Sequence, residues 1–266
     1  MNNISIANQT IKITTNGFYL LDGQKIKLLP LDFAEVKVIS PGYGRTLADS
    51  YAAMSKTGQM CSFKVTNEDS FKAACRYDKP LVMNFANAFQ PGGGFRLGAN
   101  AQEEALCRCS TLYASLRSAD ATVMYRYNLW HFSRVASDYM LISPQVCVFR
   151  DEHCQLLTQP FQVGVVTVPA PNRRGAAFFA SKSLIAETMT RRIRILLAVA
   201  ADKGYKTLVL GAWGCGAFGN SADDVSGYFR KVLVEEEFGR LFDEVCFAVY
   251  GKTEGKNILA FKKSFA

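Results

Sequence analysis

The sequence predicts an α/β fold in which helices sandwich a largely parallel sheet. Short apolar runs typical of buried strands alternate with longer segments whose apolar residues recur at helical spacing. Clusters of glycine and proline separate these segments, as expected where strands and helices end. The 266 residues, 49% of them hydrophobic, suffice for one large domain with a substantial core.

The N-terminal residues predict small, locally paired elements. Residues 10–28 alternate between apolar and polar side chains, and both Asn16-Gly17 and Asp22-Gly23 are turn signals. We therefore expect a small meander or two short hairpins. The following segments predict a helix over Leu47–Met54, a strand over Cys61–Val65, and a helix that Asn67 caps and that ends at Cys75.

From residue 80 onward, strands and helices are expected to alternate. Pro80 precedes the first strand of this part, and Gly204 is placed to end the longest helix. In chain order, the pattern predicts a strand over Leu81–Phe85, a helix from an Asn100 cap through Leu116, extended segments at Tyr139–Ile142 and Val146–Phe149, a strand over Val163–Val168, a helix over Ser181–Lys203, a strand over Thr207–Gly211, a helix over Ser221–Phe238 and a strand over Glu244–Tyr250.

Composition narrows the classes of protein. No apolar run approaches roughly 18 residues, the length of a membrane span, and no leader peptide is visible. The eight cysteines include no Cys-x-x-Cys pair, and there are two histidines, so we expect no metal site and reduced, structural thiols in the cytoplasm. The net charge of +8 suggests an anionic partner, either nucleic acid, anionic lipid or a phosphate-rich ligand.

The most informative stretch pairs a glycine loop with an acidic helix start. Gly92-Gly93-Gly94 follows the first strand of this region, and Gln102-Glu103-Glu104 comes after seven intervening residues. Asn100 fits the N-cap position, with Glu103 closing a capping box. Glycines let a ligand approach the backbone, and paired glutamates suit acid–base chemistry. Either tripeptide alone is also typical of a flexible turn or of helix-dipole complementarity.

A second glycine loop joins a strand to a helix. Gly214, Gly216 and Gly219 form a G-x-G-x-x-G pattern, which suits phosphate binding because glycine permits close approach and the next helix offers N–H groups. A dinucleotide-binding fold would need a ribose-binding acid at the end of a further strand, yet Glu235-Glu236-Glu237 falls in or after a helix. No kinase motif follows either. A plain tight turn is the remaining alternative.

Together, the two loops resemble those of the microbial-type poly(ADP-ribose) glycohydrolases. That family combines three glycines and a Gln-Glu-Glu with a diphosphate loop like the one at 214–219 in this chain. The resemblance covers about 80–252. It implies a macrodomain-like three-layer sandwich with an N-terminal extension, namely an accessory region over 1–79 and a catalytic region over 80–266. It also implies poly(ADP-ribose), or an ADP-ribosylated macromolecule, as substrate, no cofactor and no stable membrane association.

The resemblance also implies roles for individual residues. Glu104 would be the general acid that then activates water, and Glu103 would hold hydroxyl groups of the distal ribose. One tension is that a helix N-terminus favours an ionised carboxylate, whereas a general acid must carry its proton. Gln102 would help to fix the turn, and Asn87 would hydrogen-bond the distal ribose. The other implied substrate-binding residues are Gly92, Gly93 and Gly94 of the first loop and Gly214, Cys215, Gly216, Ala217, Phe218 and Gly219 of the second, with Phe218 packed against a ribose.

Three other functions stay open from the sequence. A related hydrolase could remove single ADP-ribose groups from a protein or a nucleobase. A non-catalytic macrodomain could only bind ADP-ribose, although Glu103 and Glu104 argue against it. A nucleotide-dependent oxidoreductase is disfavoured by the position of the G-x-G-x-x-G pattern near the C-terminus.

Overall fold

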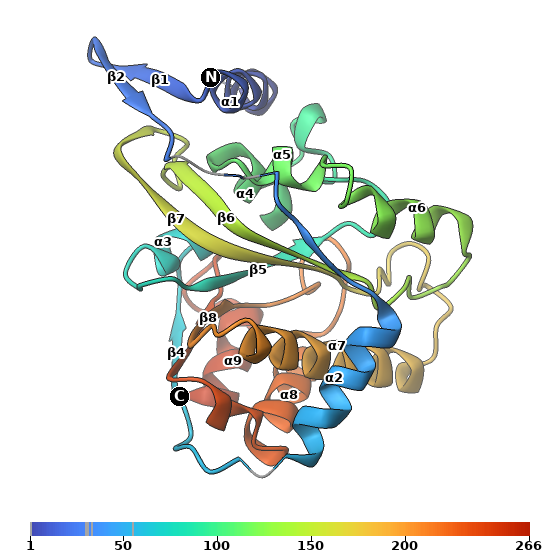
Figure 1. Ribbon diagram of the computed structural model, residues 1–266. Coiled ribbons are helices and arrows are strands. Elements are labelled where there is room, and N and C mark those ends of the chain that lie inside the picture. Colours follow the sequence, from blue (N-terminus) through green and yellow to red (C-terminus); the bar gives the residue numbers. More distant parts are fainter. Residues whose placement is uncertain (1, 30–31, 33, 55) are drawn as a thin grey trace.

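A seven-stranded mixed sheet forms the centre of the molecule in the computed structural model, which describes residues 2–29, 32, 34–54 and 56–266 (Figure 1). Across the sheet, the strands are β3 (Lys37–Ile39), β6 (Met140–Arg150), β7 (Leu156–Pro169), β5 (Leu81–Ala86), β8 (Thr207–Leu210), β9 (Glu244–Ala248) and β4 (Ser62–Thr66). From β7 to β4 all neighbours are parallel, whereas β6 pairs antiparallel with both β3 and β7. The predicted α/β class with a largely parallel sheet is confirmed.

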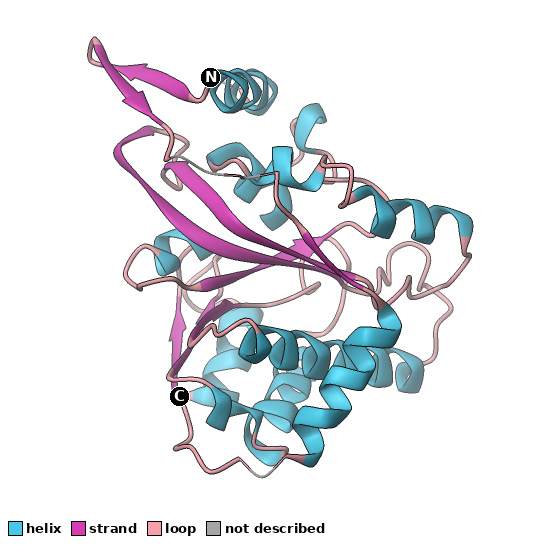
Figure 2. Cartoon of the chain, viewed as in Figure 1, coloured by secondary structure: helices cyan, strands magenta, loops and turns pink. Residues whose placement is uncertain are grey.

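Helices cover both faces of the sheet and make three layers (Figures 1 and 2). The helices form two groups, one on each face, and each group packs against the sheet through its own buried cluster. The first group is α1 (Asn3–Asn16), α3 (Ser70–Ala74), α4 (Gln102–Cys109), α5 (Leu112–Leu116) and α6 (Thr122–Trp130). The second is α2 (Pro41–Ala53), α7 (Lys182–Asp202), α8 (Ala222–Arg230) and α9 (Lys256–Phe265).

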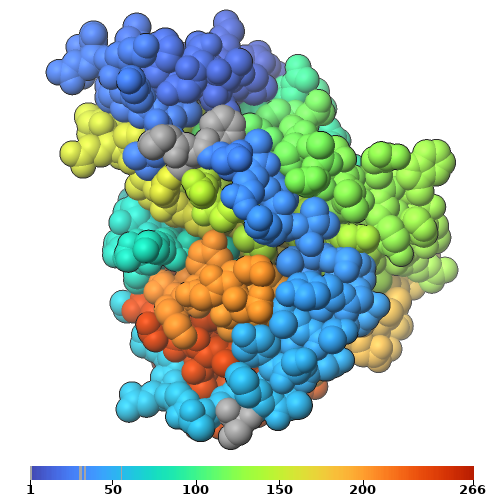
Figure 3. Space-filling view, viewed as in Figure 1, coloured from blue at the N-terminus to red at the C-terminus, as the bar shows by residue number. Residues whose placement is uncertain are grey.

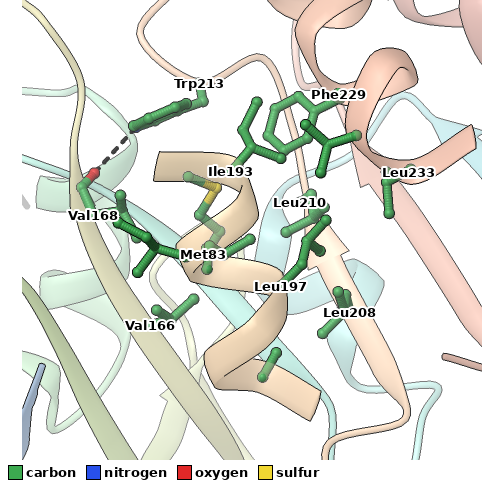
Figure 4. Close-up of a cluster of buried hydrophobic side chains, with 14 of the residues drawn as sticks. Met83, Val166, Val168, Ile193, Leu197, Leu208, Leu210, Trp213, Phe229 and Leu233 are labelled. Carbon is green, nitrogen blue, oxygen red and sulfur yellow. Dashed lines mark hydrogen bonds between the residues drawn. The ribbon is translucent and has the colours of Figure 1, made fainter. Parts of the chain in front are cut away.

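The central strands read as continuous apolar runs because both of their faces are buried. In β5, Val82 belongs to the cluster beneath α4, whereas Leu81 and Met83 belong to the cluster beneath α7. Figure 4 shows part of this second cluster, including Ile193 of α7. The indole of Trp213 completes it and donates a hydrogen bond of 3.0 Å to the Val168 carbonyl oxygen. This bond ties the start of the second glycine loop to the end of β7.

The N-terminal prediction was partly wrong. Residues 3–16 form helix α1, capped by the Asn2 side chain, and Gly17 ends it in the left-handed conformation at φ 73°. The Asn16-Gly17 signal therefore marks a helix end rather than a turn between strands. Asp22-Gly23 does form a hairpin turn, between β1 (Phe18–Leu21) and β2 (Gln24–Lys27). The alternation of apolar and polar residues suggested strands, but Ile6, Thr10 and Ile13 are buried at the spacing of a helix.

Several element boundaries also differ from the expectation. Asp69, rather than Asn67, caps the short helix α3, and the Asn67 side chain instead pairs with the backbone of Gly251. The two predicted extended segments near 140 and 149 are one strand, β6, with an irregular register between them. The helix expected over 221–238 is α8 followed by a π-helical turn, η2 (Lys231–Glu235), and a 3-10 helix, η3 (Phe238–Leu241).

Residues 1–79 are built into the same sheet and into both helical layers. They supply the edge strands β3 and β4 as well as helices α1, α2 and α3. In the space-filling view, the blue N-terminal residues cover the upper end of the molecule, above green and yellow segments (Figure 3). The division of the chain at residue 79 stays a prediction about function.

Candidate active site

The two glycine loops follow neighbouring strands at the carboxyl-terminal end of the sheet. The first follows β5 and the second follows β8, and these strands are parallel neighbours, so that their carboxyl ends lie together. Ligands in α/β folds bind at this end. A cavity of about 1180 Å³ opens there, and its lining includes Gln102 and Glu104 from the start of α4 and Gly214, Gly216, Ala217 and Phe218 from the second loop.

Gly93 lies directly against the two carboxyl groups. Its φ is 53°, in the left-handed region, and a Cβ atom there would lie 2.4 Å from Glu104 Oε1 and 3.3 Å from Glu103 Oε2. A side chain at this position would collide with the acidic pair. The first glycine loop therefore brings backbone close to both glutamates, and the 3-10 helix η1 (Phe95–Leu97) follows it.

The Glu104 side chain is fixed by backbone donors. Its Oε1 accepts a hydrogen bond of 2.9 Å from Gly94 N–H, and its Oε2 accepts one of 3.0 Å from Ala101 N–H. Ala101 occupies the N-cap position, so the Asn100 cap and the Glu103 capping box were wrong. The Asn100 side chain instead accepts a hydrogen bond on Oδ1 from the Arg108 guanidinium. Glu104 thus closes the helix start while it also faces the cavity.

Glu103 points into the protein and is 3% exposed. Its Oε2 accepts a hydrogen bond of 2.7 Å from Asn87 N–H, and Asn84 Nδ2 lies 3.3 Å from its Oε1. Burial raises the pKa of Glu103 to about 8, and the negative charge of Glu104 adds to this shift against the opposing hydrogen bonds. The Asn84 Oδ1 atom is buried without a partner in the described structure.

Gln102 fastens the acidic helix start to the sheet. Its Oε1 accepts from Phe85 N–H at 2.9 Å, and its Nε2 donates to the Met83 carbonyl at 2.8 Å and to the Ser70 hydroxyl at 3.1 Å. These contacts extend the hydrogen bonding of β5 into the first turn of α4.

The Asn87 side chain shapes the loop that leaves β5. Its Oδ1 accepts from the N–H groups of Phe89 and Gln90 at 2.8 and 3.0 Å. Its Nδ2 donates no hydrogen bond within the described residues, so this group is available to a ligand. Asn87 is half-buried, and its backbone N–H donates to the Glu103 carboxyl group.

The second glycine loop presents a row of unpaired backbone donors. Within the described part of the chain, the N–H groups of Gly216, Ala217 and Phe218 donate no hydrogen bond. Consecutive free N–H groups are a typical anion-binding arrangement. Asn220 holds the loop in shape, donating to the carbonyl oxygens of Pro171 at 2.9 Å and Gly214 at 3.2 Å.

The glycines of this loop serve different purposes. Gly214 and Gly219 have φ of 74° and 71°, and a Cβ atom on Gly214 would lie 2.6 Å from Asn220 Nδ2. Gly216 has open space around it, so the protein itself does not demand glycine there. The Cys215 thiol is half-buried, and burial raises its pKa to about 12. Helix α8 offers a ligand fewer free N–H groups than expected, because its Asp224 N–H already donates to the Ser221 hydroxyl.

Sequence reasoning missed several residues of the site. Asn84 stands in the middle of buried β5 and contacts both Glu103 and the Thr167 hydroxyl. A polar residue inside an otherwise apolar strand was the available signal. Asn220 gave no comparable signal, since asparagine before a helix is ordinarily a cap residue.

A family model and solved structures agree with this geometry. The model described as the catalytic domain of microbial-type PARG matches residues 7–151. A solved structure of poly(ADP-ribose) glycohydrolase (PARG) from Thermomonospora curvata superposes with a TM-score of 0.90 at 35% identity, over 99% of both chains. The chain belongs to the microbial-type PARG family. It is therefore the catalytic domain of a glycohydrolase, and its fold matches the macrodomain-like PARG structures.

Two further PARG structures contain bound ligands. The Thermomonospora curvata protein with the inhibitor ADP-HPD matches at 34% identity and a TM-score of 0.88, over 99% of both chains. PARG from Deinococcus radiodurans in complex with ADP-ribose matches at 36% identity and a TM-score of 0.80, over 89% of this chain and 97% of that one. A comparison with curated proteins finds no match.

The described residues of this PARG offer neither a membrane-spanning helix nor a cluster of metal ligands. None of their helices combines the length and apolar character needed to cross a membrane. The same residues contain no group of three or more His, Cys, Asp or Glu side chains placed to hold a metal ion. All eight cysteines are free thiols.

Proposed function

We propose that this PARG hydrolyses the ribose–ribose O-glycosidic bonds of poly(ADP-ribose) and releases ADP-ribose. The observation that carries the proposal is the position of Glu104. Its carboxyl group lines a cavity that also contains the free N–H groups of Gly216, Ala217 and Phe218. An acid–base group and a diphosphate site thus share one cavity. The ligands named for the solved relatives, ADP-ribose and ADP-HPD, support this reading.

The proposed reaction passes through an oxocarbenium-like state at the distal ribose. Glu104 donates a proton to the leaving ribose oxygen as the glycosidic bond breaks. It then takes a proton from the water that attacks the anomeric carbon, so that it ends in its starting state. Glu104 is assigned this role rather than Glu103 because it lines the cavity, whereas Glu103 lies within the protein.

The other residues are proposed to bind and orient the substrate. The backbone N–H groups of the loop at 214–219 hold the diphosphate, and Phe218 packs against a ribose. Asn87 binds the distal ribose through its free Nδ2 group. Glu103 accepts from Asn87 N–H and so fixes the backbone that carries the Asn87 side chain. The close approach of backbone at Gly93 leaves the acidic pair uncovered by any side chain there.

We propose that the region 1–79 supports this site by holding the start of α4 and the loop before it, and Asn3 and Ile6 of α1 also line the cavity. The Thr10 hydroxyl donates to the Arg108 carbonyl oxygen at 2.7 Å, and Asn3 Nδ2 donates to the Gly98 carbonyl oxygen at 3.0 Å. The Arg108 guanidinium in turn donates to the carbonyl oxygen of Ala99. Helix α1 therefore braces both α4 and the loop that leads to Glu103 and Glu104.

Incubation with labelled poly(ADP-ribose), followed by separation of the products, tests the proposal. We expect release of ADP-ribose. Binding of ADP-ribose without any hydrolysis would contradict the proposal and favour a reader. Release of ADP-ribose only from singly modified protein or nucleobase would instead assign the chain to the mono-ADP-ribosyl hydrolases.

A further inference from the structure

Two neighbouring phenylalanine rings are exposed in a segment that contacts the second glycine loop. Phe178 is 66% exposed and Phe179 is 81% exposed, and their ring centroids lie 4.9 Å apart in an edge-on arrangement. Both belong to the segment 171–180, between β7 and α7. Neighbouring exposed aromatic side chains of this size commonly mark a binding surface.

The backbone of this segment holds the two rings in place. The Asn172 carbonyl oxygen accepts from Gly175 N–H at 3.0 Å and from Ala177 N–H at 2.9 Å. Phe178 N–H donates to the Gly175 carbonyl oxygen at 2.9 Å, and Ala177 is fully buried in the cluster beneath α7. Helix α7 begins directly afterwards, with Ser181 as its N-cap. The rings are therefore presented by an ordered turn.

The segment is also joined to the proposed diphosphate loop. Arg173 N–H donates to the Phe218 carbonyl oxygen at 2.9 Å. The Arg174 side chain lies over Gly219, where an added Cβ atom would be 3.1 Å from its Cγ. Phe178 and Phe179 thus follow within a few residues of two contacts to the loop at 214–219.

The segment carries positive charge as well as aromatic rings. Arg174 is exposed and Arg173 is half-buried. No acidic side chain in the described residues forms a salt bridge with either of them. Aromatic rings beside arginines are typical of surfaces that bind single-stranded nucleic acid, where bases stack on rings and phosphates pair with arginine.

We propose that Phe178, Phe179 and Arg174 bind the next ADP-ribose unit of the polymer, the one that stays on the chain after cleavage. This inference rests on the proposed function. In the polymer, the distal ribose of one unit is bonded to the adenosine of the next, so a second adenine base and diphosphate must emerge beside the cleavage site. An adenine stacked on these rings, with its phosphates near Arg174, matches the chemistry of the segment.

Kinetics on the polymer, together with binding of ADP-ribose, test the proposal. The double variant Phe178→Ala/Phe179→Ala should raise KM for long poly(ADP-ribose) by about tenfold or more, since stacking of one base contributes on that order. Its affinity for ADP-ribose should equal that of the unchanged protein. Phe178→Tyr/Phe179→Tyr keeps both aromatic faces for stacking, so its KM should stay as low as that of the unchanged protein. Leu20→Ala, which removes an apolar side chain that is 63% exposed on the β1–β2 hairpin, is the matched control.

Binding measurements separate this inference from the proposed function. In a Glu104→Gln background, the ratio of polymer affinity to ADP-ribose affinity should fall when both phenylalanines are removed, whether or not the chain hydrolyses the polymer. An unchanged ratio would overturn the inference. An oligomer that dissociates when both rings are removed would also overturn it, because the rings would then bind a second copy of the chain.

Discussion

The Asn84 amide and the Glu103 carboxyl group face each other inside the sheet, with Nδ2 and Oε1 3.3 Å apart. Asn84 is thus a buried polar contact of Glu103, and its Oδ1 atom has no hydrogen-bond partner within the described residues. The Asn84 Nδ2 group also lies 3.3 Å from the Thr167 hydroxyl, so it links Glu103 to β7.

The first prediction concerns stability and pH. The folded pKa of Glu103, about 8, lies above its ordinary value of 4.5 because the side chain is buried. The contribution of this group is therefore fully present below about pH 4.5 and is lost as pH rises through about 8. Glu103→Gln cannot ionise, so its free energy of unfolding should gain on the unchanged protein by up to about 1.4 kcal/mol per pH unit in that window. Urea unfolding of both proteins across the window checks this, and parallel pH profiles would contradict it.

The second prediction concerns Glu104→Gln and separates catalysis from binding. Turnover of poly(ADP-ribose) should fall by about 10²–10⁴-fold, because glutamine cannot exchange a proton with the substrate. ADP-ribose affinity should change little. Glu104 accepts one hydrogen bond on each oxygen, from Gly94 N–H and Ala101 N–H. In Glu104→Gln the new NH2 group replaces one of these oxygens and faces an N–H donor, so the free energy of unfolding should fall by about 1–3 kcal/mol. Initial rates, calorimetric binding and urea melts measure the three effects, with Glu187→Gln on the exposed surface of α7 as control. Near-normal hydrolysis by Glu104→Gln would refute the mechanism.

The third prediction uses the open surroundings of Gly216. Since a Cβ atom there would meet nothing within 4 Å, Gly216→Val should fold normally but should fill the space in which backbone meets phosphate. ADP-ribose binding should be abolished, as measured by calorimetry. Gly42→Val is the matched control, because Gly42 also has nothing within 4 Å and lies in α2. Undiminished binding by folded Gly216→Val would make this loop a simple turn.

The fourth prediction is that ADP-ribose stabilises the fold. A ligand held only by the native state adds about 2.7 kcal/mol to the free energy of unfolding at a hundredfold excess over its Kd. Thermal melts with ADP-ribose, AMP and NAD should show the largest rise in Tm with ADP-ribose. A larger rise with NAD would argue against a site built for the free distal ribose.

The fifth prediction concerns Cys154. The neighbouring Cys109 thiol lowers the pKa of Cys154, and the charges of Arg108 and Arg150 add to this effect against burial. The Cys154 thiolate should therefore form more readily than the thiolates of the buried cysteines, and Cys154 should react with iodoacetamide faster than the other cysteines. Peptide mass spectrometry after brief labelling would rank it against the exposed Cys75. Preferential labelling of Cys75 would contradict the prediction.

The strands and the long helix α7 could be predicted because their burial is regular. Buried apolar residues recur along α7 from Ile185 to Leu197, and Ser181 caps it as expected. The two loops of the site could also be located, since glycine clusters and paired glutamates are visible without a structure. The direction of each glutamate could not be predicted. Neighbouring residues at a helix start point to different sides, and only the position of β5 decides that Glu103 faces the core.

The errors have a common physical origin in competition between local signals. Asn67 and Asp69 are both good cap residues, and Asp69 prevails because its Oδ1 accepts from two backbone N–H groups. Asn100 lost its expected role because Glu104 itself satisfies the Ala101 N–H. The edge strand β3 has three residues and left no periodic signal long enough to detect.

The pairing of β4 with β9 has a consequence for how the chain folds during synthesis. Residues 62–66 pair in parallel with residues 244–248, about 180 positions later in the sequence. Until those residues leave the ribosome, the outer strand has no neighbour, and its backbone N–H and C=O groups stay open to pairing with another chain. This edge of the sheet can form only after residues 244–248 have been synthesised, and contacts of such long sequence separation form slowly. Premature termination before residue 244 would therefore produce an aggregation-prone chain rather than a smaller enzyme.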